Sequence, residues 1–147
     1  MNKAALLRWA LPLAALFGLS GVGMAAYASH GLGFIADAAL REAARASLQQ
    51  AVLQQMLHAP VLVSLGFWGA YCAQTGRAVP LSLLCAAALF ALGVLLFSGL
   101  IYLRVLTGFV GFNSLVPAGG MALMAGWLAL FAAAWGLRNA SLADLQP

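Results

Sequence analysis

Two histidines, His30 and His58, are the side chains of this sequence best suited to chemistry. A neutral imidazole can ligate a metal or a haem iron, or relay a proton. Gln55 precedes His58 by three residues, so on a helix both side chains could face one pocket. Tyr102 and Asn113 belong to the next connection on the same side of the predicted fold and could join the histidines. The candidate polar site therefore consists of His30, Gln55, His58, Tyr102, Arg104 and Asn113.

Three interpretations of the histidines stay open at this point. In the plainest, both rings bond backbone carbonyls or the neighbouring glutamines and fix helix ends. In the second, the polar cluster binds a small molecule or a lipid headgroup. In the third, His30 and His58 ligate haem or a metal, although two histidines without a nearby Cys, Asp or Glu form a thin ligand set for zinc or copper. We expect no cofactor and no metal, with haem or a metal at these two histidines not excluded.

The acidic residues offer little for catalysis. Acid–base chemistry needs a positioned acid and a positioned base, but Asp37 and Glu42 are spaced to pair with Arg41 and Arg45 on one helix. No nucleophile elbow, phosphate-binding loop or metalloprotease helix is present in the sequence. We therefore predict that the protein is not an enzyme.

Arg104 has two possible roles. At the end of a membrane span, its guanidinium can extend to the lipid headgroups while its methylene groups stay among apolar neighbours. Alternatively, it could hold an anionic ligand beside Tyr102.

Four stretches without a charged residue must position these side chains, namely 9–36, 46–76, 78–103 and 105–137. Crossing the hydrocarbon core of a bilayer takes roughly 20 apolar helical residues, so each stretch suffices for one crossing. Of the 147 residues, 65% are hydrophobic and 7% are charged, whereas soluble domains carry about 25% charged residues. The sequence thus predicts one all-α domain, a four-helix transmembrane bundle with spans near 8–29, 50–73, 79–103 and 117–137. A short interfacial amphipathic helix is predicted before the second span, near 34–49, either lying at the membrane surface or leading into that span.

Small residues form a stripe on the first span and another on the fourth. In lipid, such stripes let helix backbones approach closely. The best functional hypothesis is a non-enzymatic membrane protein that acts through helix packing, as a homo-oligomer or as an accessory subunit. The alternative is a ligand-binding or transport protein with its site around His30 and His58. The two stripes are Ala14, Gly18, Gly21 and Ala25, and Ala118, Ala122, Gly126, Ala129, Ala133 and Gly136.

Two segments depart from regular spans. Pro60 lacks an amide hydrogen and clashes with the carbonyl of Met56, so it predicts a kink near His58. Residues 106–116 are apolar but contain two glycines and Asn113, which predicts a connecting or partly re-entrant segment.

The basic residues suggest an orientation. Cytoplasmic ends of spans carry an excess of lysine and arginine, and the first span usually dominates. Because Lys3 and Arg8 flank the first span, we predict that both termini are cytoplasmic. This orientation places Arg77 and Arg138 inside, and Arg41, Arg45 and Arg104 outside. The basic residues are scattered singly, so the expected partner is the lipid bilayer and not a nucleic acid.

Four motifs occur in order along nearly the whole chain: GMAAYASHGL at 23–32, AVLQQMLHA at 51–59, LFSGLIY at 96–102 with LTG at 106–108, and PAGG at 117–120 with GW at 126–127. Together they resemble domain-of-unknown-function family 423, whose members are small four-helix proteins of bacterial inner membranes. The resemblance implies a multi-pass inner-membrane protein and supplies no activity. Gln54 and Leu57 replace tyrosines of the family pattern, Pro60 replaces a leucine, and Arg104 replaces an apolar residue. If those tyrosines shape a polar site in relatives, that site is altered here.

Overall fold

The computed structural model describes residues 2–143, with side chains for residues 2–136, and no strand occurs within this part of the chain. The α-helices are α1 (Lys3–Arg8), α2 (Ala10–His30), α3 (Ala38–Thr75), α4 (Leu81–Val94), α5 (Leu100–Thr107) and α6 (Val116–Ala143). A π-helical turn, η1 (Leu95–Gly99), joins α4 to α5, and a 3-10 turn, η2 (Asn113–Leu115), precedes α6. Four helical rods are long and apolar enough to cross a membrane: α1–α2, α3, α4–η1–α5, and η2–α6. The predicted all-α fold with four spans is therefore confirmed. The side chain of Arg138 lies outside the described residues.

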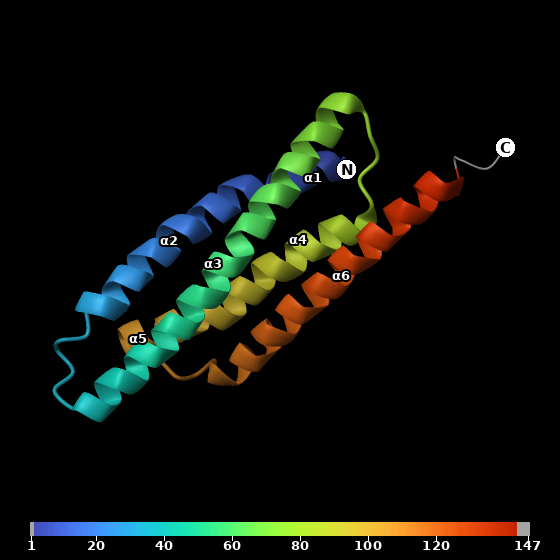
Figure 1. Ribbon diagram of the computed structural model, residues 1–147. Coiled ribbons are helices and arrows are strands. Elements are labelled where there is room, and N and C mark those ends of the chain that lie inside the picture. Colours follow the sequence, from blue (N-terminus) through green and yellow to red (C-terminus); the bar gives the residue numbers. More distant parts are fainter. Residues whose placement is uncertain (1, 144–147) are drawn as a thin grey trace.

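The four rods form two antiparallel hairpins that meet through their inner members (Figure 1). The most extensive contacts join α2 to α3 and α4 to α6, and α3 also packs against α1, α4 and η1. Within the most apolar stretch of each rod, 39% of residues are buried for α3 and for α4–α5, compared with 22% for α1–α2 and 17% for α6. The two inner rods thus carry the core, and α2 and α6 lie on its flanks.

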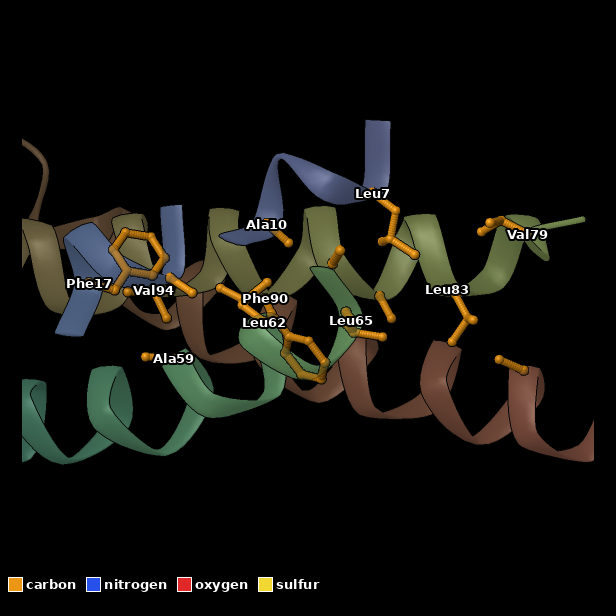
Figure 2. Close-up of a cluster of buried hydrophobic side chains, with 14 of the residues drawn as sticks. Leu7, Ala10, Phe17, Ala59, Leu62, Leu65, Val79, Leu83, Phe90 and Val94 are labelled. Atoms are coloured by element: carbon orange, nitrogen blue, oxygen red, sulfur yellow. The ribbon is translucent and has the colours of Figure 1, made fainter. Parts of the chain in front are cut away.

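The main core takes side chains from all four rods. Figure 2 shows the core extending along the bundle, with Phe17 of the first rod toward one end, Phe90 of α4 near the middle and Leu7 of the first rod farther along. Gly69 of α3 permits close approach to the first rod, because a Cβ there would lie 2.8 Å from the Cβ of Leu7. A second, smaller cluster lies near the far end of α2 and contains Ala28, Leu32 and Leu48, with Tyr27, Ile35, Tyr102 and Val105 packed against it.

The segment predicted as a short interfacial helix over 34–49 is not a separate element. Residues 31–37 form a connection, and the Asp37 carboxylate then caps α3 by accepting from the N–H groups of Ala39 (2.8 Å) and Leu40 (3.0 Å). Neither glycine nor proline occurs between this cap and Pro60, so the charged turns continue directly into the second span. Helix α3 passes through Pro60 unbroken and ends at Gly76, whose φ of 69° lies in the left-handed region.

The connection before α6 is a short turn with exposed apolar side chains. Helix α5 ends at Gly108, with φ 72°, and the side chains of Phe109, Val110 and Phe112 are exposed. Only η2 separates this turn from α6.

Each small-residue stripe has a glycine that packs inside the chain, whereas an added Cβ at Gly18 or Gly136 would meet nothing within 4 Å. A Cβ on Gly21 of α2 would lie 2.6 Å from the Met56 sulfur on α3. A Cβ on Gly126 of α6 would lie 2.7 Å from the Phe90 ring on α4. Close helix approach, which the stripes predict, is thus used to build the monomer.

Candidate functional site

His58 lies deep within the bundle, with 4% of its surface exposed. Its Nδ1 is 2.7 Å from the backbone oxygen of Gln54, and its Nε2 is 3.1 Å from Nε1 of Trp127 on α6. An indole N–H can only donate, so Nε2 must accept and Nδ1 must carry the proton that it donates to Gln54. These two bonds select one neutral tautomer and use both ring nitrogens.

Aromatic rings enclose this imidazole. The His58 ring centroid is 5.3 Å from that of Phe90 and 5.9 Å from that of Trp127. The Phe90 and Trp127 rings meet edge to face, with centroids 5.2 Å apart. We call these three residues the histidine cluster; it joins α3, α4 and α6. A metal or haem iron at Nε2 would have to displace the indole.

The structure does not bring His30 and His58 together. Arg45 Nε donates to the Ala28 oxygen (3.3 Å), and Gln55 Nε2 donates to the Phe17 oxygen (2.6 Å), which fixes the register between α2 and α3. His30 is exposed at the end of α2. At 1.5 Å per residue, it lies roughly 20 Å along the helix axes from the level of His58. The predicted shared site is therefore not formed.

Gln55 serves a different contact from its neighbour His58. With 2% of its surface exposed, it points toward α2 and donates from Nε2 to the Phe17 oxygen and, at 2.9 Å, to the Ser20 hydroxyl. A polar side chain in hydrocarbon must find such partners, because no water is available there. Gln55 thus ties the first span to the second. Sequence reasoning did not single out Ser20 for this contact.

Ser98 makes the matching contact on the other side of α3. It is fully buried on η1, and its hydroxyl donates to the Ala51 backbone oxygen at 2.8 Å. Gly119 of α6 crosses the same π-helical turn, against the backbone of Phe97. Residues from three of the four sequence motifs therefore meet around η1.

The remaining candidate residues lie at the end of the bundle that holds His30. The Tyr102 hydroxyl is buried and has no hydrogen-bond partner among the described residues. Arg104 lines a groove between α3 and α5. Asn113 opens η2, where its backbone N–H donates to the Val110 oxygen at 3.1 Å. Tyr102, Arg104 and Asn113 thus lie at the same end as His30, whereas Gln55 and His58 lie away from them.

Replacing Tyr102 with phenylalanine is expected to raise the free energy of unfolding by about 1 kcal/mol in lipid-free detergent, because a buried polar group without a partner costs free energy. The measurement is a denaturant titration of the purified protein. The control is Tyr71→Phe, since the Tyr71 side chain is exposed and its ring faces Arg77 through its π surface. A loss of stability in the Tyr102 variant alone would show that the hydroxyl has a partner.

The comparison with known protein sequences covers most of the residues described in the candidate site. A family model described as a protein of unknown function (DUF423) matches residues 24–120. This chain belongs to that family. The UPF0382 membrane protein SH2409 of Staphylococcus haemolyticus (strain JCSC1435) is 30% identical over 118 residues, which cover 80% of this chain and 88% of that one. No solved structure matches.

The match confirms the resemblance carried by the four motifs. In this DUF423 protein, the matched region includes Ala51, His58, Ser98 and Gly119 and stops before Trp127. Within the part that the structure describes, no three His, Cys, Asp or Glu side chains gather in one place. Glu42 pairs with Arg45 at 3.1 Å on the surface.

Proposed function

We propose that this DUF423 protein is a non-enzymatic component of the bacterial inner membrane that acts through helix packing, as a homo-oligomer or as an accessory subunit. The observation that carries the proposal is the unequal burial of the spans. Helix α6 packs one side against α4 and η1, and only 17% of its most apolar stretch is buried within the chain.

The outer face of α6 supports packing against a second helix. Its exposed large side chains include Trp127 and Trp135 and a row formed by Met121, Met124, Leu128 and Phe131. The residues of this row recur at spacings of three, four and three residues, the pattern that forms a continuous seam between two helices. The small-residue stripe of α6 is already used against α4, so this seam is the face left for a second copy or another membrane protein.

The buried polar groups support a structural role. The side chains of His58, Gln55 and Ser98 each form a hydrogen bond to another rod, and these three bonds hold spans together. Asp37 caps α3, and Glu42 pairs with Arg45. We do not propose the alternative site shared by His30 and His58, because their separation along the α2–α3 pair leaves no common pocket. A Soret band or stoichiometric metal that is lost on changing His58 would contradict this.

The orientation belongs to the same proposal. Lys3, Arg8 and Arg77 lie at the end of the bundle that holds the N-terminus, which supports cytoplasmic termini.

Disulfide crosslinking in membranes tests the oligomer. Cys72 is buried and Cys85 is exposed, so Cys85→Ser removes the accessible thiol. In that background, Leu128→Cys is expected to give an oxidant-dependent dimer. Leu19→Cys on the outer side of α2, which is equally apolar and exposed, is the matched control and should give none.

Two results separate the forms of the proposal. A dimer that persists after reconstitution of the purified chain supports the homo-oligomer, whereas a crosslink seen only in native membranes and at a different mass supports the accessory subunit. If Leu128→Cys gives neither, and single-molecule counting finds monomers at every protein-to-lipid ratio, the proposal fails.

A further inference from the structure

A groove of about 410 Å³ opens between the first turns of α3 and the end of α5. Its walls are largely apolar, with one guanidinium and one hydroxyl. The lining residues are Phe34, Ile35, Ala43, Ala44, Ser47, Arg104 and Val105. Ile35 and Val105 also pack against the second core cluster, and no residue of α6 lines the groove.

The guanidinium of Arg104 is uncompensated. Among the described residues, it has no hydrogen bond and no ion pair. The two carboxylates at this end of the bundle are both engaged, Asp37 with backbone N–H groups of α3 and Glu42 with Arg45. The groove therefore offers up to five N–H donors on Arg104 and no free carboxylate. Such a site suits an anion.

The position of the groove along the bundle says which anion would reach it. Helix α5 ends at Thr107, and the charged first turns of α3 begin at Ala38, so the groove lies where a span passes from hydrocarbon to headgroups. A guanidinium binds phosphate through two parallel hydrogen bonds. Ile35 and Val105 supply apolar wall beside it, which a free phosphate ion would not need.

We propose that this groove binds an anionic phospholipid, with Arg104 paired to the phosphate and the apolar wall against the glycerol and the first acyl carbons. A zwitterionic headgroup fits less well, because its cationic amine would meet an uncompensated guanidinium and no free carboxylate. The buried, unpartnered hydroxyl of Tyr102 belongs to the same cluster as Ile35 and Val105, so a second unsatisfied polar group lies close to the groove.

The test uses the full chain purified in detergent. Binding is measured by native mass spectrometry and by the shift in thermal unfolding midpoint, with phosphatidylglycerol, with phosphatidylcholine of the same acyl chains, and with inorganic phosphate. Wild-type protein is expected to bind phosphatidylglycerol more tightly than phosphatidylcholine. Arg104→Gln should weaken phosphatidylglycerol binding by roughly tenfold or more, the loss expected for a hydrogen bond to a charged group.

Matched variants separate a built site from general charge attraction. Arg77→Gln removes a basic residue at the opposite end of the bundle, beside Tyr71, and should bind phosphatidylglycerol as wild type does. Arg104→Lys keeps the positive charge but lacks the planar guanidinium that forms two parallel hydrogen bonds, and it should bind with intermediate affinity. This variant also replaces Arg104→Gln in the test if Arg104→Gln does not fold.

Each contrary outcome overturns the proposal. Equal binding by wild type and both Arg104 variants would remove Arg104 from the site. Equal losses in Arg77→Gln and Arg104→Gln would show non-specific attraction to anionic lipid. Phosphatidylcholine binding as tightly as phosphatidylglycerol would refute the headgroup preference, and inorganic phosphate giving the full shift would assign the groove to a free anion.

Discussion

Replacing Gly119 with alanine is expected to lower the free energy of unfolding by about 1–3 kcal/mol, the usual cost of forcing an extra methyl into a packed interface. A Cβ at this position would lie 2.5 Å from the backbone nitrogen of Phe97 and 2.8 Å from the backbone carbon of Leu96. Both obstacles are main-chain atoms of the third rod, so α6 must move away from η1 to relieve the clash. Unfolding by denaturant titration in mixed micelles measures the loss.

The neighbouring glycine provides the control. A Cβ on Gly120 would find its nearest neighbour, an atom of the Phe97 ring, at 3.8 Å, which is ordinary contact. Gly120→Ala should therefore be neutral or stabilising, since alanine is favoured over glycine in a helix by about 1 kcal/mol. Equal losses at the two positions would mean that α6 does not cross η1 as described.

Replacing His58 with alanine is expected to cost about 2–5 kcal/mol. The change removes a buried ring from between Phe90 and Trp127, which leaves a cavity. It also leaves the part-buried Trp127 N–H without its acceptor, which adds to the cost. The same titration is the readout, and His30→Ala is the control. Because His30 is exposed and belongs to neither core cluster, its replacement should change stability by less than about 0.5 kcal/mol.

A double-mutant cycle tests whether the bond to Trp127 carries part of this loss. Trp127→Phe keeps an aromatic ring and removes the N–H donor. If the hydrogen bond matters, the effects of His58→Ala and Trp127→Phe will not add, with a coupling of about 0.5–3 kcal/mol. Additive effects would instead assign the whole loss to packing.

The spans were predictable because charge is so sparse in this chain. The span predicted over 79–103 corresponds to the rod Leu81–Thr107, and the one predicted over 8–29 to Lys3–His30. The helix of the second span begins earlier than predicted, because the charged turns after Asp37 suggested a separate interfacial helix. A helix with a good cap and no breaker simply continues, and α3 therefore begins at Ala38, well before residue 50.

That early start explains why the residues of the predicted site do not lie close together. With the second span beginning near residue 50, His58 would lie close to the membrane surface and near His30. In the structure, Arg45 is level with the end of α2, so His58 falls near the middle of the bundle. Residue spacing shows which side chains share a helix face, but it does not fix the register between two helices. The pairing of His58 with Trp127 depends on that register and on how α6 packs, neither of which the sequence pattern encodes.

The turn η1 gives one rod two different orientations. A π-helical turn holds an extra residue compared with an α-helical one, so everything after Gly99 is rotated by about 100° relative to a regular continuation. Upstream, Phe90 and Val94 face the main core; downstream, Tyr102 and Val105 face the second cluster. Deleting a single amino acid from this stretch would swing the downstream half, including Arg104, away from its neighbours and leave the upstream half in place. The number of residues in this turn, and not their chemical character alone, decides which side chains the last turns of the third rod can contact.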